Sequence, residues 1–161
     1  MATGQTGIAI SGWGIAVDHG ISDFVAGAAS KLVHDGAERA LALDEQQRRA
    51  LGHPAYSGVT LGLLHGSKPD LLILCHRAGA TDIDDYPGVP IRPLPELIQT
   101  YEAATAWVDH PARVVAIAVN TRGLDDDAAR AELGRVSAET GLPADDPVRF
   151  GGDRLLDALG L

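Results

Sequence analysis

The sequence predicts an α/β protein with a mostly parallel sheet flanked by helices. Short apolar runs recur along the chain, and longer segments with helical periodicity separate them. The apolar runs are continuous instead of alternating with polar residues, which indicates strands that are buried on both faces of a parallel sheet. A length of 161 residues fits one hydrophobic core. We therefore expect residues 1–161 to form a single domain.

The first third of the chain predicts one strand and one helix. The run from Gly7 to Ile10 is short and apolar with glycines around it, as in a buried strand. From Ser22 to about Leu32, apolar residues share one helical face, and Ser22 or Asp23 is a suitable N-cap. The segment from Ala37 to Leu51 is rich in helix-forming residues, although its leucines also allow a strand.

The rest of the chain alternates strands and helices. Apolar runs predict three strands, at Leu71–Cys75, Val114–Val119 and Val148–Phe150. Helical periodicity predicts three helices, from near Val59, from Leu94 to Val108 and from Asp125 to Thr140. The last helix starts in acidic residues that suit the helix dipole and stops at Gly141. Four prolines between Asp82 and Pro95 predict an irregular connection.

Composition and charge exclude several classes of function. The chain has 22 acidic and 13 basic residues, a net charge of -9, and no basic cluster, so nucleic acid is not an expected partner. It contains neither a secretory signal nor a long apolar span, and Cys75 is its only cysteine. We expect a cytoplasmic protein without membrane contact. Cys75 lies within an apolar run, and we expect its thiol to be buried and slow to react.

Polar residues follow two of the predicted strands. His76 and Arg77 come after the first of these strands, and Asn120 and Thr121 come after the second. Ligands of open parallel sheets bind beyond the carboxyl ends of the strands, so these residues are candidates for binding a small molecule. Ordinary loop polarity is the alternative interpretation.

Two further polar segments add candidate binding residues. Gln5 and Thr6 lie in a glycine-rich loop before the first strand, where backbone amides can approach a ligand. His53, Tyr56 and Ser57 precede the helix near Val59. We expect Gln5, Thr6, Tyr56 and Ser57 to gather with His76 around one pocket, with His53 near its rim. Alternatively, His53 and Tyr56 only cap and staple that helix.

Metal and triphosphate sites are not expected. The histidines lack zinc-binding spacing, and no cysteine pair exists. A Walker A loop needs lysine followed by Ser or Thr behind its glycines, and neither Gly-Lys-Ser nor Gly-Lys-Thr occurs. We therefore expect no tight binding of ATP by this chain.

Several segments together resemble one known family. They are Ala2-Thr3-Gly4-Gln5-Thr6-Gly7-Ile8, Ser22-Asp23-Phe24-Val25-Ala26-Gly27-Ala28, His53-Pro54-Ala55-Tyr56-Ser57-Gly58-Val59, Leu61-Gly62-Leu63-Leu64-His65-Gly66, Leu72 to Gly79, Tyr86-Pro87 and Asp146-Pro147-Val148-Arg149-Phe150-Gly151. In this order they resemble the D-glutamate N-acetyltransferase-like family, formerly a domain-of-unknown-function family. The resemblance implies a P-loop NTPase-like fold similar to dethiobiotin synthetase, and acetyl transfer from acetyl-CoA to the amino group of D-glutamate. It also implies that Asn120 and the Pro147 region receive an adenine.

The sequence departs from the family pattern in two places. Family members carry a Gly-Lys loop upstream of the Thr-Gly-Gln-Thr-Gly segment, so the resemblance implies that this chain lacks the Walker A strand, loop and helix. Asp44 to Arg49 replaces the family's Glu-Gly-Gln-Gly turn. Besides the substrate side of an acetyltransferase, two alternatives stay open: a non-catalytic small-molecule-binding or oligomerisation module, and a truncated family member without activity. We expect a homo-oligomer or a partner chain that supplies the missing half, because a missing strand exposes sheet edges.

Overall fold

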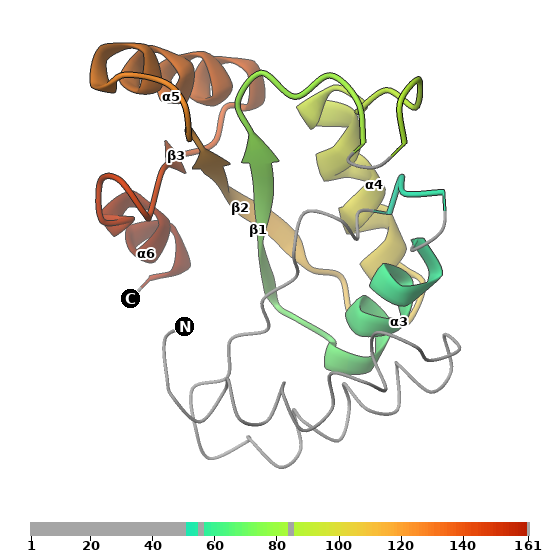
Figure 1. Ribbon diagram of the computed structural model, residues 1–161. Coiled ribbons are helices and arrows are strands. Elements are labelled where there is room, and N and C mark those ends of the chain that lie inside the picture. The colour runs from blue at the N-terminus through green and yellow to red at the C-terminus, as the bar shows by residue number, and fades with distance from the viewer. Residues whose placement is uncertain (1–50, 55–56, 84–85, 161) are drawn as a thin grey trace, which may run out of the picture. The chain divides into compact units, whose positions relative to one another are not determined.

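The computed structural model describes residues 51–54, 57–83 and 86–160 (Figure 1). The chain divides into two compact units, one formed by Met1–Pro69 with Trp107–His110 and the other by Asp70–Ala106 with Pro111–Leu161. The predicted strand at Gly7–Ile10 and the predicted helix at Ser22–Leu32 lie outside the described residues, as does the segment from Ala37 to Ala50.

The first unit contains helix α3, Ser57–Ser67. The helix begins two residues before the predicted start at Val59, because the Ser57 backbone N–H already donates to the His53 carbonyl oxygen at 3.1 Å. At the other end Lys68 adopts a positive φ of 46° while its N–H still donates to the Leu64 carbonyl at 3.0 Å. Such a left-handed residue is a common way to end a helix.

The second unit is built on a parallel sheet of three strands in the order β1-β2-β3. The strands are β1 (Leu71–Arg77), β2 (Arg113–Asn120) and β3 (Ala144–Asp145). The predicted α/β class and the parallel arrangement are confirmed. The first two strands extend beyond their predicted ends, so that His76, Arg77 and Asn120 are the last residues of strands instead of loop residues.

The prediction of a strand at Val148–Phe150 is wrong, because the chain turns there. The carboxylate of Asp146 accepts hydrogen bonds from the N–H groups of Val148 and Arg149, at 3.0 and 3.1 Å. The Phe150 N–H donates back to the Asp146 carbonyl at 2.8 Å. An aspartate that binds the backbone two residues ahead is a strong turn signal, and here it overrides the β-propensity of the apolar residues.

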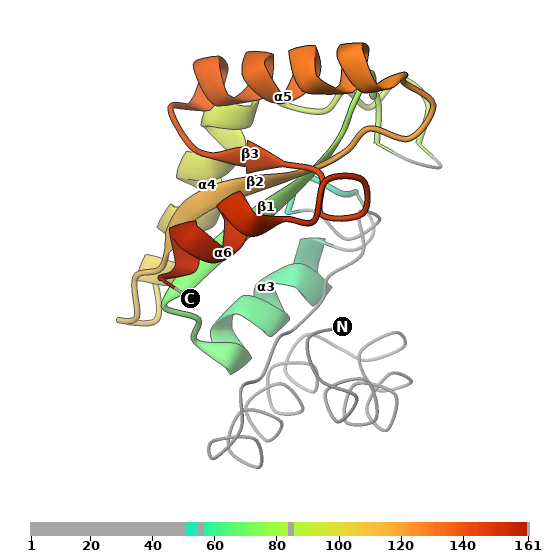
Figure 2. The same cartoon turned by 90° about the vertical axis from the view of Figure 1, so that its left-hand side faces the viewer.

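Three helices pack on this sheet: α4 (Leu94–Ala106), α5 (Asp126–Thr140) and α6 (Asp153–Leu159). α4 and α5 share one apolar core with the sheet, and α6 packs against β2 and β3 from the opposite face (Figure 2). The boundaries of α5 agree with the prediction, because Asp125 accepts from the Ala128 N–H as N-cap and Gly141 ends the helix with φ of 72°. α6 was not predicted. No helix in the described ranges has the length and apolarity needed to cross a bilayer.

A bulge between the first two strands decides which side chains face the core. Leu72 pairs with Val114 but Leu74 pairs with Ile117, so β2 carries one extra residue between these pairs. All four side chains therefore face α4 and α5 and belong to the core.

The prediction that Cys75 is buried is wrong, and the residue is exposed. Successive side chains of a strand point to opposite faces, so Cys75 points away from the side that Leu74 shares with α4 and α5. Arg77, two residues further along the strand, is exposed as well. The carboxyl end of β1 therefore lacks the two-sided burial that its continuous apolar sequence predicts.

Candidate functional site

The carboxyl ends of β1 and β2 lie side by side, as the sequence predicts. Arg77 is the register partner of Asn120, and the Ala78 N–H donates to the Asn120 carbonyl at 3.0 Å. This edge is where open parallel sheets normally hold their ligands.

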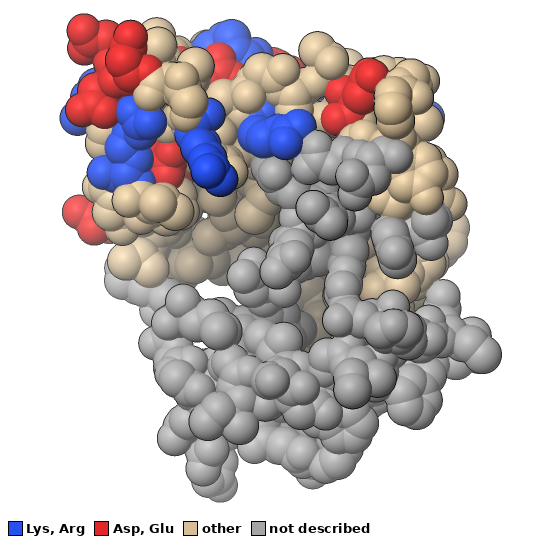
Figure 3. Space-filling view, in the orientation of Figure 1, with Lys and Arg blue, Asp and Glu red and all other residues tan. Residues whose placement is uncertain are grey.

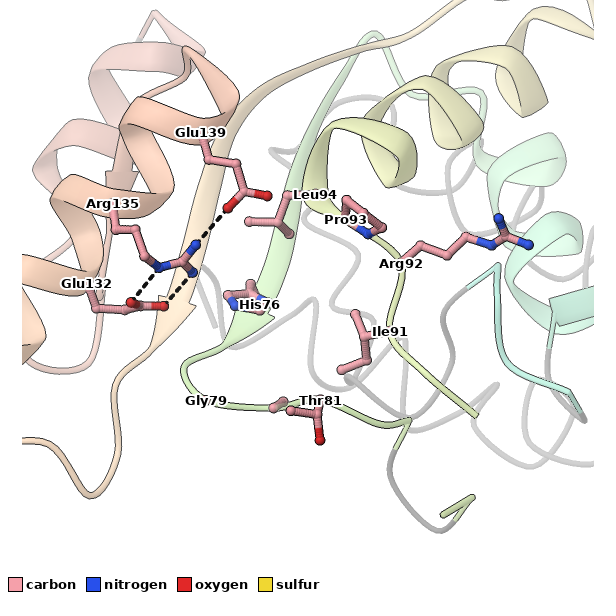
Figure 4. A pocket seen from close by; sticks show the side chains of 11 residues that line it. His76, Gly79, Thr81, Ile91, Arg92, Pro93, Leu94, Glu132, Arg135 and Glu139 are labelled. Carbon is pink, nitrogen blue, oxygen red and sulfur yellow. Dashed lines mark hydrogen bonds and ion pairs between the residues drawn. The ribbon is translucent and has the colours of Figure 1, made fainter. Parts of the chain in front are cut away.

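An open cleft of about 510 Å³ lies at this edge, on the side of the sheet that carries α4 and α5 (Figure 4). The end of β1, the connection into α4 and one face of α5 line it. The lining residues are His76, Gly79, Ala80, Thr81, Ile91, Arg92, Pro93, Leu94, Glu132, Arg135 and Glu139. The irregular proline-rich connection predicted from the sequence therefore forms one wall of the cleft.

The α5 wall of the cleft carries a network of three charged residues. The Arg135 guanidinium donates to both carboxylate oxygens of Glu132, at 2.8 and 2.7 Å, and to Glu139 at 2.7 Å. The spacing i, i+3 and i+7 places the three side chains on one helical face. The hydrogen bonds from Arg135 lower the pKa of Glu132, and the partner carboxylates raise the pKa of Arg135, so Glu132 and Arg135 stay charged at neutral pH.

His76 faces this network from the carboxyl end of strand β1. It is the register partner of Val119, which belongs to the core, so its imidazole lies on the α5 side of the sheet (Figure 4). Burial lowers the pKa of His76, Arg135 lowers it further, and Glu132 and Glu139 act in the opposite direction. None of the hydrogen bonds among the described residues involves this imidazole. A half-buried, neutral imidazole is thus available to a ligand.

Arg77 and Asn120 do not line the cleft with His76. Arg77 follows His76 in the strand, so it points to the other face of the sheet. The Asn120 side-chain oxygen accepts from the Arg122 N–H at 3.0 Å and shapes the turn after β2. The predicted cluster at this edge is therefore divided between two faces.

The remaining predicted binding residues lie elsewhere in the chain. His53 is buried and Ser57 starts α3, and both belong to the first compact unit. Gln5, Thr6 and Tyr56 lie outside the described residues. Convergence of these groups with His76 remains a prediction.

The sequence reasoning missed the charged wall of the cleft. Glu132, Arg135 and Glu139 lie inside an amphipathic helix, where charged residues usually form a solvated face. The signal that could have found them is the i, i+3, i+7 spacing on the helix that follows β2, because this helix packs on the face of the sheet that carries His76. Their spacing alone does not distinguish a site from a surface ion-pair network.

Thr121 has a structural role at the same edge. It is fully buried, and Asp146 accepts hydrogen bonds from both its N–H and its hydroxyl, at 3.0 and 2.5 Å. Arg149 adds a bond to the Leu124 carbonyl and an ion pair with Asp126, each at 2.8 Å. These contacts fix the turn after β3 against the end of β2.

The face of the molecule shown in Figure 3 carries charges of both signs. Over α5, Lys and Arg side chains lie beside Asp and Glu side chains (Figure 3). Within residues 51–54, 57–83 and 86–160, no group of three or more His, Cys, Asp or Glu side chains is placed to hold a metal ion.

Comparisons with known proteins agree on one family. The model of the domain of unknown function DUF1611_C, described as a P-loop domain, matches residues 1–156. Two D-glutamate N-acetyltransferases are similar, one from Tritonibacter scottomollicae (42% identity, 98% of this chain and 47% of the relative) and one from a Pseudoalteromonas species (39%, 96% and 46%). The crystal structure of a DUF1611 family protein from Anabaena variabilis ATCC 29413 superposes with a TM-score of 0.84, at 43% identity over 98% of this chain and 46% of that one. The chain thus spans about half the length of these relatives.

Proposed function

The chain belongs to the DUF1611 family, as the sequence resemblance predicted, and we propose that it forms the acceptor side of an acetyltransferase that acts on an amino acid. The similarity to two D-glutamate N-acetyltransferases over nearly the whole chain carries this proposal. D-Glutamate is accordingly the first acceptor to test.

The described site suits an amino acid better than a polyanion. Glu132 and Glu139 contribute two negative charges and Arg92 and Arg135 two positive charges, so the cleft is neutral overall when His76 is neutral. An amino acid carries both signs and can be complemented by both. A triphosphate would need an excess of positive charge.

Acetyl-CoA is the proposed acetyl donor, and it supplies an activated thioester when bound. The residues at and after the carboxyl ends of the strands include the types of group that bind an adenine nucleotide. Asn120 offers an amide, Arg122 an exposed guanidinium and Val148, 96% exposed, an apolar surface. Asn120 is therefore the proposed cofactor-binding residue, with Arg77 nearby on the same face of the sheet.

We also propose that the protein is cytoplasmic and that it acts as a homo-oligomer or together with a chain that supplies a phosphate-binding half. The second candidate function is a non-catalytic binding or oligomerisation module. This alternative rests on the sequence expectation that a missing strand exposes sheet edges.

The experiment that tests the proposal is acetylation of D-glutamate by the purified chain with acetyl-CoA, followed by chromatographic detection of N-acetylglutamate. L-Glutamate and D-alanine serve as comparison acceptors. Formation of the acetylated product above the enzyme-free rate supports the acetyltransferase. Absence of product, combined with an oligomer in light scattering that binds neither acetyl-CoA nor amino acid in calorimetry, would favour the assembly module.

A further inference from the structure

The cleft combines a neutral imidazole with a carboxylate that cannot easily move. His76 forms no side-chain hydrogen bond with the described residues, and its pKa is lowered by burial. Glu132 is held on two oxygens by Arg135, which Glu139 holds in turn. Figure 4 shows the imidazole pointing from β1 toward this network, across the cleft from Ile91 and Pro93.

We infer that the cleft is the acceptor subsite and that His76 is the base that takes a proton from the acceptor's amino group. This inference rests on the proposed function. The bound acceptor's ammonium group first loses one proton to solvent, which frees the nitrogen lone pair. The amine nitrogen then forms a bond to the acetyl carbon, the carbon–sulfur bond breaks, and the thiolate of CoA leaves with the electron pair. The nitrogen gives its surplus proton to the neutral imidazole, which later releases it to solvent or to the thiolate.

Glu132 acts as a positioning residue in this scheme. Once His76 has taken the proton, the imidazolium is stabilised by the carboxylates of Glu132 and Glu139, which raise its pKa. The bidentate bond to Arg135 keeps the Glu132 carboxylate ionised and oriented, which is the arrangement that preorganised electrostatic stabilisation requires.

Other charged groups around His76 leave this assignment intact. Arg135 opposes protonation of the imidazole but is bonded to two carboxylates. Arg92, on the connection before α4, pairs with Glu96 at 3.5 Å and is largely exposed. It remains able to approach a carboxylate of the acceptor, whose ammonium group can then face Glu139 and His76.

The test compares His76→Gln and Glu132→Gln with wild type in the D-glutamate assay, with Asp157→Asn as control because Asp157 is exposed on α6 and does not line the cleft. H76Q should lower kcat about 100-fold, the usual contribution of a general base, with KM changed less than about threefold. It should also abolish the acidic limb of the profile of kcat/KM against pH. E132Q should move that limb to lower pH, because removing a carboxylate lowers the pKa of His76. D157N should behave as wild type.

If wild type acetylates D-glutamate and H76Q keeps both the wild-type rate and the acidic limb of the pH profile, the role of His76 is overturned. The proposed function would then still stand. Wild type without any acetylation would overturn the proposed function and this inference together. Thermal unfolding of each variant checks that it is folded. If H76Q fails to fold, the imidazole resonances of wild-type His76 decide, because D-glutamate must shift them while those of His65 stay in place.

Discussion

Asp146 accepts two hydrogen bonds from Thr121, one from its backbone N–H at 3.0 Å and one from its hydroxyl at 2.5 Å. The other carboxylate oxygen accepts from the N–H groups of Val148 and Arg149. One buried carboxylate thus joins the end of β2 to the turn that follows β3. Burial acts to raise the pKa of Asp146, but the hydrogen bonds from Thr121 and the turn outweigh it, and the pKa is lowered.

The first prediction concerns the contribution of this carboxylate to stability. Asp146→Ala should lower the free energy of unfolding by about 3 kcal/mol, because hydrogen bonds to a charged group contribute roughly 1.5–3 kcal/mol each and buried donors would be left unpaired. Urea denaturation at pH 7 measures this. A carboxylate with a lowered pKa stabilises the fold above its unfolded-state pKa, so the difference between wild type and variant should narrow below about pH 4.

Thr121 provides the matched control. Thr121→Val removes only the hydroxyl bond and should cost about 1–2 kcal/mol, whereas Thr121→Ser keeps the hydroxyl but removes a buried methyl group and should cost about 1 kcal/mol. A valine variant as stable as wild type would contradict the role given to the hydroxyl.

This turn also marks where the sequence could and could not predict the fold. The apolar runs at Leu71 and Val114 and the capped helix that ends at Gly141 were predicted from local patterns, because periodicity and caps act within a few residues. The two-residue strand at Ala144–Asp145 and helix α6 were not predicted, since both are too short for periodicity to be visible. Their placement depends on Asp146 and its partner Thr121, which is 25 residues away.

The second prediction uses two glycines in opposite environments. Gly152 has φ of 76°, and an added Cβ would lie 3.0 Å from the Cβ of Pro147, so Gly152→Ala should lower stability by about 1–2 kcal/mol. Gly134 lies within α5, where an added Cβ meets nothing within 4 Å, and Gly134→Ala should raise stability by about 0.5–1 kcal/mol. Thermal unfolding of both variants gives the two signs, and a stabilised G152A would contradict the described turn.

The third prediction concerns Cys75. Because the residue is exposed on the face of β1 opposite the core, a water-soluble thiol reagent should label it in the native protein. The expected result is one equivalent per chain, at a rate within about tenfold of the urea-unfolded protein, with Cys75→Ser as the unlabelled control. If labelling appears only after unfolding, Cys75 is buried in the native protein, as its apolar sequence predicts.

The candidate site was predictable only in part. The rule that ligands bind at the carboxyl ends of parallel strands identified His76 and Asn120. It could not separate His76 from Arg77, because their opposite directions depend on the strand continuing through both residues. The rule also did not identify Glu132 and Arg135, because their position opposite His76 depends on the packing of α5 on the sheet.

The last prediction concerns the dependence of stability on pH that His76 introduces. Burial lowers the folded-state pKa of His76, so between this value and the unfolded-state value of about 6.5 the unfolded chain binds more protons than the folded one. The contribution of His76 is therefore fully present above pH 6.5 and is lost as pH falls through the folded-state pKa. As the pH falls through this range, the free energy of unfolding of wild type should therefore decrease more than that of His76→Gln.

Urea denaturation of both proteins at half-unit steps from pH 8 to about pH 5 measures the difference. Glu132→Gln should enlarge the loss of stability that His76 causes toward acid. The Glu132 carboxylate raises the pKa of His76, so its removal widens the interval between the folded-state and unfolded-state pKa of His76. If wild type and H76Q lose stability in parallel, His76 titrates alike in both states and its imidazole is not held in the half-buried position beside α5. If wild type instead gains stability toward acid, the carboxylates outweigh burial, and His76 would be a charged partner of Glu132 at neutral pH.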